Sequence, residues 1–245
     1  MSRKPRFYVP NAQTRREIRL DPAQAHHALR VMRLKAGDAL ILFNQHGEEF
    51  EARLTTDDAG AAGASILSRL PARNRVRRQV TLAFAPPRGK RADFLVEKCT
   101  ELGVCRFIPL LAQRTASTAR RIGEGRLARW RRIATQAAQQ CARDSVPDID
   151  APLNVQEALS LAPEYDETWM ADPGGERPPV SLACSDASMV LAMVGPEGGF
   201  TQSELRAALT AGAASVSLGG NVLRVETACV AVAALLISTA GTESA

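Results

Sequence analysis

Two glycine-rich loops carry the residues best suited to chemistry. The segment Gly195–Gly199, of sequence Gly-Pro-Glu-Gly-Gly, directly follows the apolar run Met189–Val194. A second loop, Gly219–Arg224, follows the short run Ser215–Leu218. Glycine permits unusual backbone angles and lets main-chain amides approach a ligand closely, and α/β proteins bind ligands at the carboxyl ends of parallel strands. We therefore expect the two loops to face one cavity.

Four polar side chains lie in or just after these loops: Glu197, Arg224, Glu226 and Thr227. A carboxylate can take a proton from a reacting group, and a permanently charged guanidinium can stabilise an anion that forms during a reaction. Neither loop is a Walker A or Gly-x-Gly-x-x-Gly nucleotide fingerprint. The pattern thus indicates proton transfer and anion stabilisation beside a bound ligand.

Other common catalytic arrangements are missing from the sequence. No Gly-x-Ser-x-Gly elbow occurs, and the three histidines, His26, His27 and His46, all lie in the N-terminal part. The five cysteines are widely spaced, with no Cys-x-x-Cys pair and no histidines placed to complete a zinc site. We therefore expect no metal, and we interpret the cysteines as buried thiols.

A parallel α/β sheet must position the two loops. From Val80 onward, apolar runs of strand length alternate with helical segments, which is typical of that architecture; the runs are Val80–Ala85, Arg106–Leu111, Thr168–Ala171, Met189–Val194 and Ser215–Leu218. Thr201 and Glu204 form a capping box for a helix after the first loop. The segment Val225–Ile237 is apolar on nearly every side, so we expect it to be buried in the sheet or in the interface of a homodimer.

The N-terminal part has a different pattern, with short strands around one helix. The expected strands are Arg6–Val9, Glu17–Leu20, Ala39–Phe43, Glu49–Leu54 and Ala64–Leu70, and Asp21-Pro22 begins a helix through Leu34. This spacing predicts a small β-barrel. The arginine-rich connector Pro71–Arg78 marks the boundary between a first domain, residues 1–72, and a second, residues 73–245.

The charge of the chain favours an acidic partner. The net charge is +5, and only four of the 31 basic residues are lysines; arginine's planar fork suits phosphates and base edges. Candidate phosphate contacts lie on the connector and along one side of a helix over Arg126–Arg143: Arg73, Arg75, Arg77, Arg78, Arg126, Arg129 and Arg132. For the helix, the alternative is a solvated face.

Membrane and secreted classes are not indicated. The longest apolar stretch, Ala228–Ile237 with its small-residue flanks, is shorter than the roughly 20 residues that span a bilayer. The segment Met1–Pro10 has no apolar core typical of a secretory signal. We therefore expect a cytoplasmic protein.

The two loops together resemble a known family. The motifs Gly195–Thr201 and Leu218–Ala228 are similar to those of the S-adenosylmethionine-dependent RNA methyltransferases of the SPOUT, or trefoil-knot, superfamily. Within it the sequence is most similar to the RsmE family of 16S ribosomal RNA uridine N3-methyltransferases. The resemblance extends over nearly the whole chain, through the segments Arg6–Val9, His26–His27, Val31–Arg33, Gly37–Asp38, Glu97–Val104 and Arg129–Arg143.

Four positions depart from the family's pattern. Gly220 and Asn221 replace a Pro-Arg pair, Val225 replaces a threonine, and Gln139 replaces a glutamate. The loop glycines, Arg224 and Glu226 are all present.

The resemblance implies a PUA-like β-barrel followed by a SPOUT α/β trefoil-knot domain with a parallel sheet, acting as a homodimer on small-subunit ribosomal RNA or on the assembled small ribosomal subunit. The implied contacts with S-adenosyl-L-methionine are Val194, Gly195, Glu197, Gly198, Gly199, Leu218, Gly219, Val222 and Leu223. Arg224 would stabilise the uridine anion, with Glu226 or Glu197 as the base. Arg6 and Arg33 join the candidate RNA contacts.

Three alternatives remain open at the level of sequence. Another SPOUT enzyme, acting on a ribose 2′-hydroxyl or a purine nitrogen, would carry similar loops. A non-enzymatic RNA-binding protein would keep the barrel and the basic helix. A nucleotide-binding oxidoreductase is disfavoured because Gly-x-Gly-x-x-Gly is absent. The sequence does not specify which uridine is modified.

Overall fold

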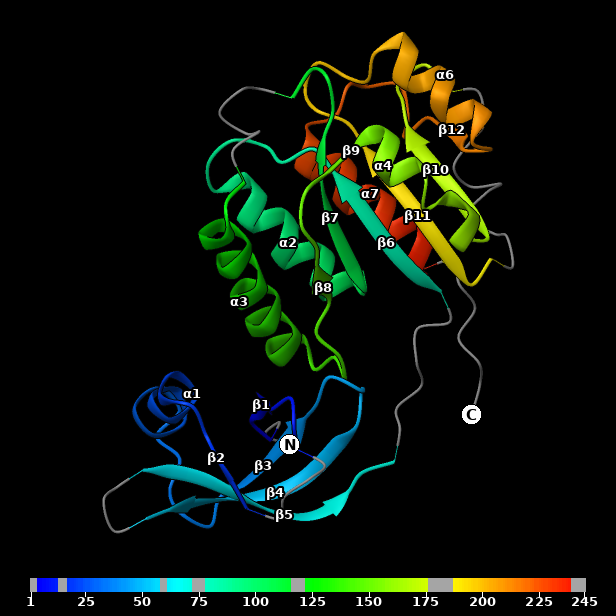
Figure 1. Ribbon diagram of the computed structural model, residues 1–245. Helices are drawn as coiled ribbons and strands as arrows, with labels where there is room; N and C mark the ends of the chain where they lie inside the picture. The colour runs from blue at the N-terminus through cyan, green and yellow to red at the C-terminus, as the bar shows by residue number, and fades with distance from the viewer. Residues whose placement is uncertain are drawn as a thin grey trace. The chain divides into compact units, whose positions relative to one another are not determined.

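The chain forms two compact units (Figure 1). The computed structural model describes residues 4–12, 17–57, 61–71, 78–115, 122–175 and 187–238. The first unit comprises residues 1–75 with residues 138–146, and the second comprises residues 76–137 with residues 147–245. The boundary expected between residues 72 and 73 lies outside the described residues.

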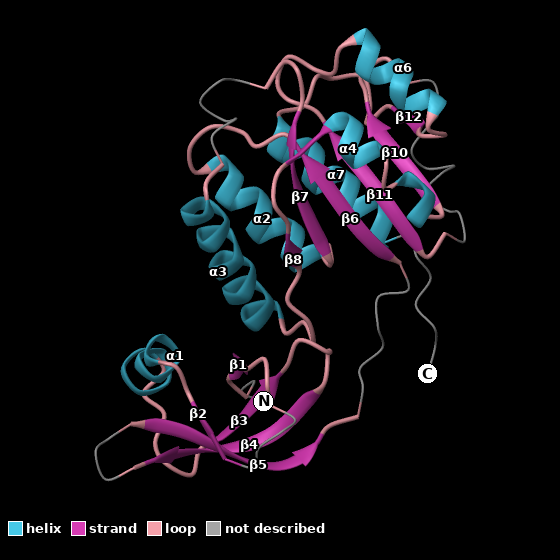
Figure 2. Cartoon of the chain, in the orientation of Figure 1, coloured by secondary structure: helices cyan, strands magenta, loops and turns pink. Residues whose placement is uncertain are grey.

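The first unit is a curled five-stranded sheet in the order β1-β3-β4-β5-β2 (Figure 2). β1 is parallel to β3, and the other neighbouring pairs are antiparallel. Its core includes Phe7, Leu42 and Phe50, which project from three neighbouring strands. The predicted barrel-like N-terminal fold is confirmed, with strands β1 (Arg6–Tyr8), β2 (Glu17–Arg19), β3 (Ala39–Phe43), β4 (Glu49–Thr56) and β5 (Ala62–Arg69).

The helix of the first unit is shorter than predicted. Asp21 caps α1 (Pro22–His26) through a capping box with Gln24, but the chain then continues as a π-helical turn, η1 (His27–Val31). Arg33 takes a left-handed conformation, with φ 55°, and the Leu34 N–H donates to the Ala28 carbonyl at 3.0 Å. This helix-ending arrangement usually has glycine at the left-handed position. Because arginine occupies this position here, nothing in the sequence indicated that the helix ends before Leu34.

The second unit is built on a parallel sheet, as predicted, and the sheet has seven strands. The order is β12-β10-β11-β6-β7-β8, and β9 also pairs with β7. Every pairing in it is parallel. The strands are β6 (Gln79–Phe84), β7 (Arg106–Leu111), β8 (Asp148–Ile149), β9 (Leu153–Asn154), β10 (Glu167–Ala171), β11 (Met189–Val194) and β12 (Ala214–Val216).

Helices cover both faces of this sheet. On one face, α7 (Val225–Ser238) packs against α2 (Arg91–Leu102) and against β6 and β11. On the same side, the Phe84 ring contacts Trp130 of α3 (Glu124–Cys141), with ring centroids 5.8 Å apart.

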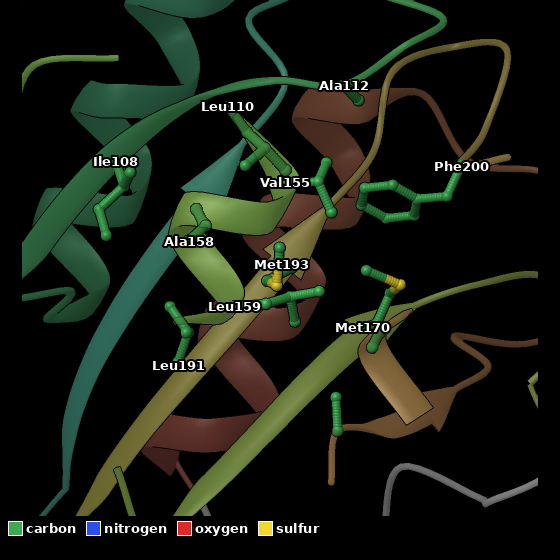
Figure 3. Close-up of a cluster of buried hydrophobic side chains, with 13 residues drawn as sticks. Ile108, Leu110, Ala112, Val155, Ala158, Leu159, Met170, Leu191, Met193 and Phe200 are labelled. Atoms are coloured by element: carbon green, nitrogen blue, oxygen red, sulfur yellow. The ribbon is translucent and has the colours of Figure 1, made fainter. Parts of the chain in front are cut away.

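The other face carries the core cluster of Figure 3, which includes Ala83, Leu191 and Met193 of the sheet. It lies against α4 (Val155–Leu159) and α6 (Gln202–Thr210), and the short turn η2 (Ala162–Glu164) follows α4.

The apolar helix α7 is buried on one side only. Its buried residues include Cys229, Val232 and Leu236. Five others are only half-buried: Val230, Ala231, Ala234, Leu235 and Ile237. Of the two expected ways to bury this helix, the sheet and α2 therefore account for one side only.

Candidate functional site

A pocket lies at the carboxyl edge of three strands that are neighbours in the sheet, β12, β10 and β11. Its volume is about 100 Å³, and it opens to solvent. The expectation that the two glycine loops face one cavity is confirmed. The lining residues are Ala171, Asp172, Pro173, Val194, Gly195, Pro196, Glu197, Gly199, Val216, Leu218, Gly219, Asn221, Val222, Leu223, Val225 and Ala228.

All but one of the residues predicted to contact a cofactor line this pocket. The exception is Gly198, which faces away from it: a Cβ at this position would lie 3.3 Å from the Cβ of Arg114. Arg224 and Glu226 do not line the pocket, whereas Glu197 does. Two of the three candidate catalytic side chains therefore lie beside the cavity.

The end of β10 and the turn after it, which no sequence motif indicated, also line the pocket. Ala171, Asp172 and Pro173 form this wall, and the Asp172 N–H donates to the Val216 carbonyl at 3.0 Å. The strand itself was predicted, so a signal existed, because parallel strands end at one edge of the sheet. What the sequence lacked was the strand order, which inserts β10 between the strands that carry the two glycine loops.

The first glycine loop is fixed at several points. At Gly195 a Cβ would lie 3.0 Å from the ring of Phe200, so only glycine fits there without displacing that ring. Gly199 has φ +69°, a left-handed conformation, and its N–H donates to the Pro196 carbonyl at 2.8 Å. Thr201 and Glu204 form the predicted capping box at the start of α6. Contacts within the chain thus define the shape of this loop.

The second loop is more open. Gly219 has φ +118°, and Val222 is 83% exposed although it is apolar. The chain just before this loop is closely packed, because a Cβ at Gly175 would lie 2.7 Å from the backbone of Val216 and Ser217. Residues 219–222 therefore form a wall with little support of its own.

A cluster of charges links the first loop to α7. Nη1 of Arg91 lies 3.8 Å from Oε1 of Glu197 and 3.9 Å from Oε1 of Glu226, distances that give Coulomb attraction without a good hydrogen bond. Glu226 is only 8% exposed. Its Oε2 is buried and has no hydrogen-bond partner among the described residues. A buried carboxylate oxygen without a donor is costly to maintain and is available to accept a proton or a hydrogen bond.

Arg91 itself was missed in the sequence analysis. It is the first residue of α2, which follows β6, and β6 is the neighbour of β11. Arg224 and Thr227 are exposed, and Arg224 precedes the first turn of α7. The arrangement therefore has one buried carboxylate, one exposed carboxylate and two arginines near the pocket edge.

Two arginines proposed as RNA contacts are structural instead. Arg6 is 7% exposed, and its Nη2 donates to Glu49 at 2.5 Å and to the Arg143 carbonyl at 2.9 Å. Arg78 is 2% exposed and donates to the carbonyls of Ala187 and Leu236, at 2.8 and 3.0 Å. Both guanidinium groups hold distant backbone segments together inside their own units and are not presented to an RNA phosphate.

The remaining predicted arginines differ in availability. On α3, the guanidinium of Arg126 lies over the Trp130 ring, 5.3 Å from its centroid, and Arg129 donates to Asp93 at 2.7 Å, an ion pair that raises the pKa of Arg129. Arg132 is exposed. In the first unit, Arg33 is exposed as well. Arg73, Arg75 and Arg77 lie outside the described residues.

Two of the cysteine thiols are poor nucleophiles. Cys99 of α2 and Cys229 of α7 are both fully buried. Burial raises the pKa of Cys99 to about 12 and the pKa of Cys229 well above its usual value, so both remain protonated thiols at neutral pH. No group of three or more possible metal-binding side chains occurs in the part of the chain that the structure describes. Within the same part, no helix has the length and apolar character needed to cross a membrane.

Two protein-family models match this chain. Residues 74–237 match the RNA methyltransferase domain, and residues 20–63 match the RNA methyltransferase PUA domain. The chain is 33% identical over 215 residues to the ribosomal RNA small subunit methyltransferase E of Synechocystis, which covers 86% of this chain and 69% of that protein. It is also 33% identical over 218 residues to the Mycobacterium tuberculosis protein of the same name, covering 85% and 81%.

Two solved structures are similar to this chain over almost its full length. The ribosomal RNA small subunit methyltransferase E of Neisseria gonorrhoeae, bound to S-adenosyl methionine, is 31% identical, with a TM-score of 0.82 and coverage of 96% of this chain and 98% of that one. A Legionella pneumophila protein solved with the same cofactor is 27% identical, with a TM-score of 0.86 and coverage of 97% and 98%. The fold is thus the PUA-like unit and SPOUT α/β domain that the sequence indicated. From its pocket, its fold and these relatives, the chain belongs to the RsmE family of RNA methyltransferases.

Proposed function

We propose that this protein transfers a methyl group from S-adenosylmethionine (SAM) to N3 of one uridine in 16S ribosomal RNA. The relatives are named as small-subunit ribosomal RNA methyltransferases, and two solved neighbours hold SAM. One observation carries the chemical part of the proposal: a buried carboxylate oxygen without a partner among the described residues, Oε2 of Glu226, lies in the first turn of the helix that lines the pocket.

The pocket suits SAM in its chemistry. Apolar walls from Val194, Val216 and Leu223 offer contact for an adenine ring, while the glycines of both loops expose main-chain groups for hydrogen bonds. Asp172 and Glu197 add negative charge beside a ligand that carries a sulfonium and an ammonium group. When bound, SAM supplies an electrophilic methyl group, so the protein must mainly align the acceptor and exclude water.

The uridine must be activated by the protein before it can accept the methyl group. N3 carries a proton, and its lone pair is delocalised, so the proton must leave or the resulting anion must be stabilised. We assign proton acceptance to Glu226, with Glu197 as the second candidate, and anion stabilisation to Arg224. Nη1 of Arg91 lies within 4 Å of both carboxylates and so joins the first loop to the start of α7.

The two units divide the work in this proposal. The PUA-like unit, with Arg33 on its surface, binds RNA, and residues 73–245 bind the cofactor and perform the transfer. α7 keeps a half-buried apolar side, and Phe94 of α2, the helix that packs against α7, is 49% exposed. We propose that a second copy covers this side in a homodimer, and that the enzyme acts in the cytoplasm.

The decisive test is product analysis. Purified protein is incubated with labelled SAM and either free 16S ribosomal RNA or assembled small subunits, and the digested nucleosides are identified by mass spectrometry. N3-methyluridine is the expected product. A 2′-O-methylnucleoside or a methylated purine would assign another SPOUT activity, and the absence of any product with both substrates, despite SAM binding, would favour an RNA-binding protein.

A further inference from the structure

The side chain of Arg114 supports the first glycine loop from the side opposite the pocket. Arg114 follows the end of β7 by three residues. Its Nη1 donates to the carbonyl oxygen of Gly198 at 2.9 Å and to that of Phe200 at 3.3 Å. Arg114 does not line the pocket. Its guanidinium therefore contacts the loop backbone and not the space that a ligand would fill.

The residue before it makes a second contact with the same region. The Gln113 N–H donates to Oε1 of Glu204 at 2.8 Å, and Glu204 is the buried member of the capping box that begins α6. In the sheet, β6 separates β7 from β11, so these bonds reach across one strand. Residues 113 and 114 thus hold the loop at its middle and at its end.

The loop needs such support because it has few side chains with which to fix itself. Glycine loses more conformational freedom on ordering than any other residue, and three of the five residues in Gly195–Gly199 are glycines. Hydrogen bonds from a charged donor are stronger than neutral ones. The two carbonyls that Arg114 binds belong to residues that flank Gly199, and Gly199 does line the pocket.

We propose that Arg114 is a positioning residue that holds the first glycine loop in its SAM-binding shape without touching SAM or the uridine. The inference rests on the proposed placement of SAM in this pocket. An exposed arginine at this edge has one competing role, a contact with an RNA phosphate, and the two roles differ in which ligand they affect.

The test compares Arg114→Ala with Arg206→Ala by calorimetric titration with SAM. Arg206 is an exposed arginine of α6 whose Nε donates to the Gln202 carbonyl of its own helix, so the control removes the same charge near the same loop. We expect Arg114→Ala to bind SAM about tenfold more weakly, and Arg206→Ala to stay within about twofold of the parent. Arg114→Lys, which keeps the charge, should recover part of the affinity.

Two further measurements separate positioning from general stability. With Arg114→Ala, KM for SAM should rise while kcat at saturating SAM stays close to the parent value. Without cofactor, amide hydrogen exchange over residues 196–200 should become faster than in Arg206→Ala, with the rest of the second unit unchanged. If Arg114→Ala does not fold, the exchange and affinity of Arg114→Lys decide in the same way.

Other results would overturn the proposal. Equal SAM affinity in the two alanine variants, with a lower salt dependence of RNA binding in Arg114→Ala, would make Arg114 a phosphate contact. Unchanged exchange over residues 196–200 would remove the positioning role. A different result would show that SAM does not bind in this pocket. In that case Ala228→Met, which places a larger side chain in the pocket, would leave SAM affinity unchanged whether or not Arg114 is substituted.

Discussion

The two loops of the pocket are both rich in glycine but differ in how firmly they are held. The first loop is bound by Arg114 from outside, by its own turn at Gly199 and by the capping box of Thr201 and Glu204. In the second loop, residues 219–222 are exposed, and the Ser217 hydroxyl makes only a long bond, 3.4 Å, to the Gly219 carbonyl. One wall of the pocket is therefore held by contacts within the chain, and the other has few such contacts.

This difference suggests a division of roles. A preformed wall reduces the conformational entropy lost on binding and so favours affinity for the cofactor. The open wall leads into Arg224 and Glu226, the groups proposed to act on the uridine. The comparison therefore predicts that changes near the first loop alter SAM affinity, and that changes after the second loop alter the rate of methyl transfer.

The largest effect is expected for Glu226→Gln. The amide keeps the shape but cannot accept the N3 proton, so single-turnover methylation should fall by about 100- to 10,000-fold, with SAM affinity little changed. Glu197→Gln, at an exposed carboxylate of the same charge cluster, is the matched control and should have a smaller effect. A normal rate with Glu226→Gln would place the base elsewhere.

Arg224→Ala should lower the single-turnover rate by about 100- to 1,000-fold, because one fixed donor to the forming anion is removed. Cofactor affinity should stay nearly normal. The rate should recover in part as pH rises, since more of the uridine is then already ionised. If SAM affinity falls in proportion to the rate, Arg224 supports the second loop. The proposed division of roles between cofactor binding and methyl transfer would then be wrong.

Ala228→Met places a larger side chain in the pocket wall without backbone strain, because the residue is helical. We expect SAM affinity to fall about tenfold, in line with the usual cost of overfilling a packed site. Ala234→Met, on the half-buried side of the same helix, is the control. An equal loss of affinity in both would indicate a general effect on α7.

Glu204→Ala removes the carboxylate that accepts hydrogen bonds from the backbone N–H groups of Thr201 and Gln113. The free energy of unfolding should fall by about 1–3 kcal/mol, because two partly buried hydrogen bonds lose their acceptor, and SAM affinity should fall with it. Chemical denaturation measures the first quantity. Unchanged stability would mean that the first loop is not held through its capping box.

The smallest effect concerns RNA. Replacing Arg126 and Arg132 by glutamine should reduce the slope of log affinity against log salt by about 0.7 to 0.9 for each of the two arginines that binds a phosphate. Arg129→Gln should change it little, because Arg129 is already paired with Asp93. An unchanged slope in the double variant would show that this side of α3 is only solvated.

Much of the fold could be predicted from local pattern. The alternation of apolar runs and helical segments indicated the strands of the parallel sheet, and the Thr201–Glu204 spacing indicated the start of α6, because such signals depend on neighbours in sequence. The predicted limits failed where a turn used an unexpected residue, as at Arg33, whose left-handed backbone ends the first helix without glycine.

The sequence by itself determined the two glycine loops, their place after strands and the resemblance that names the family. Only the tertiary structure decided which distant residues meet them. The order of the strands brings Asp172 into the pocket, sets Arg91 between two carboxylates and carries Arg114 across β6 to the loop. Tertiary packing also buries Arg6 and Arg78, two of the arginines expected to contact RNA. The physical reason is that strand order and burial follow from packing between residues far apart in the sequence. The local periodicity of a sequence carries no information about such packing.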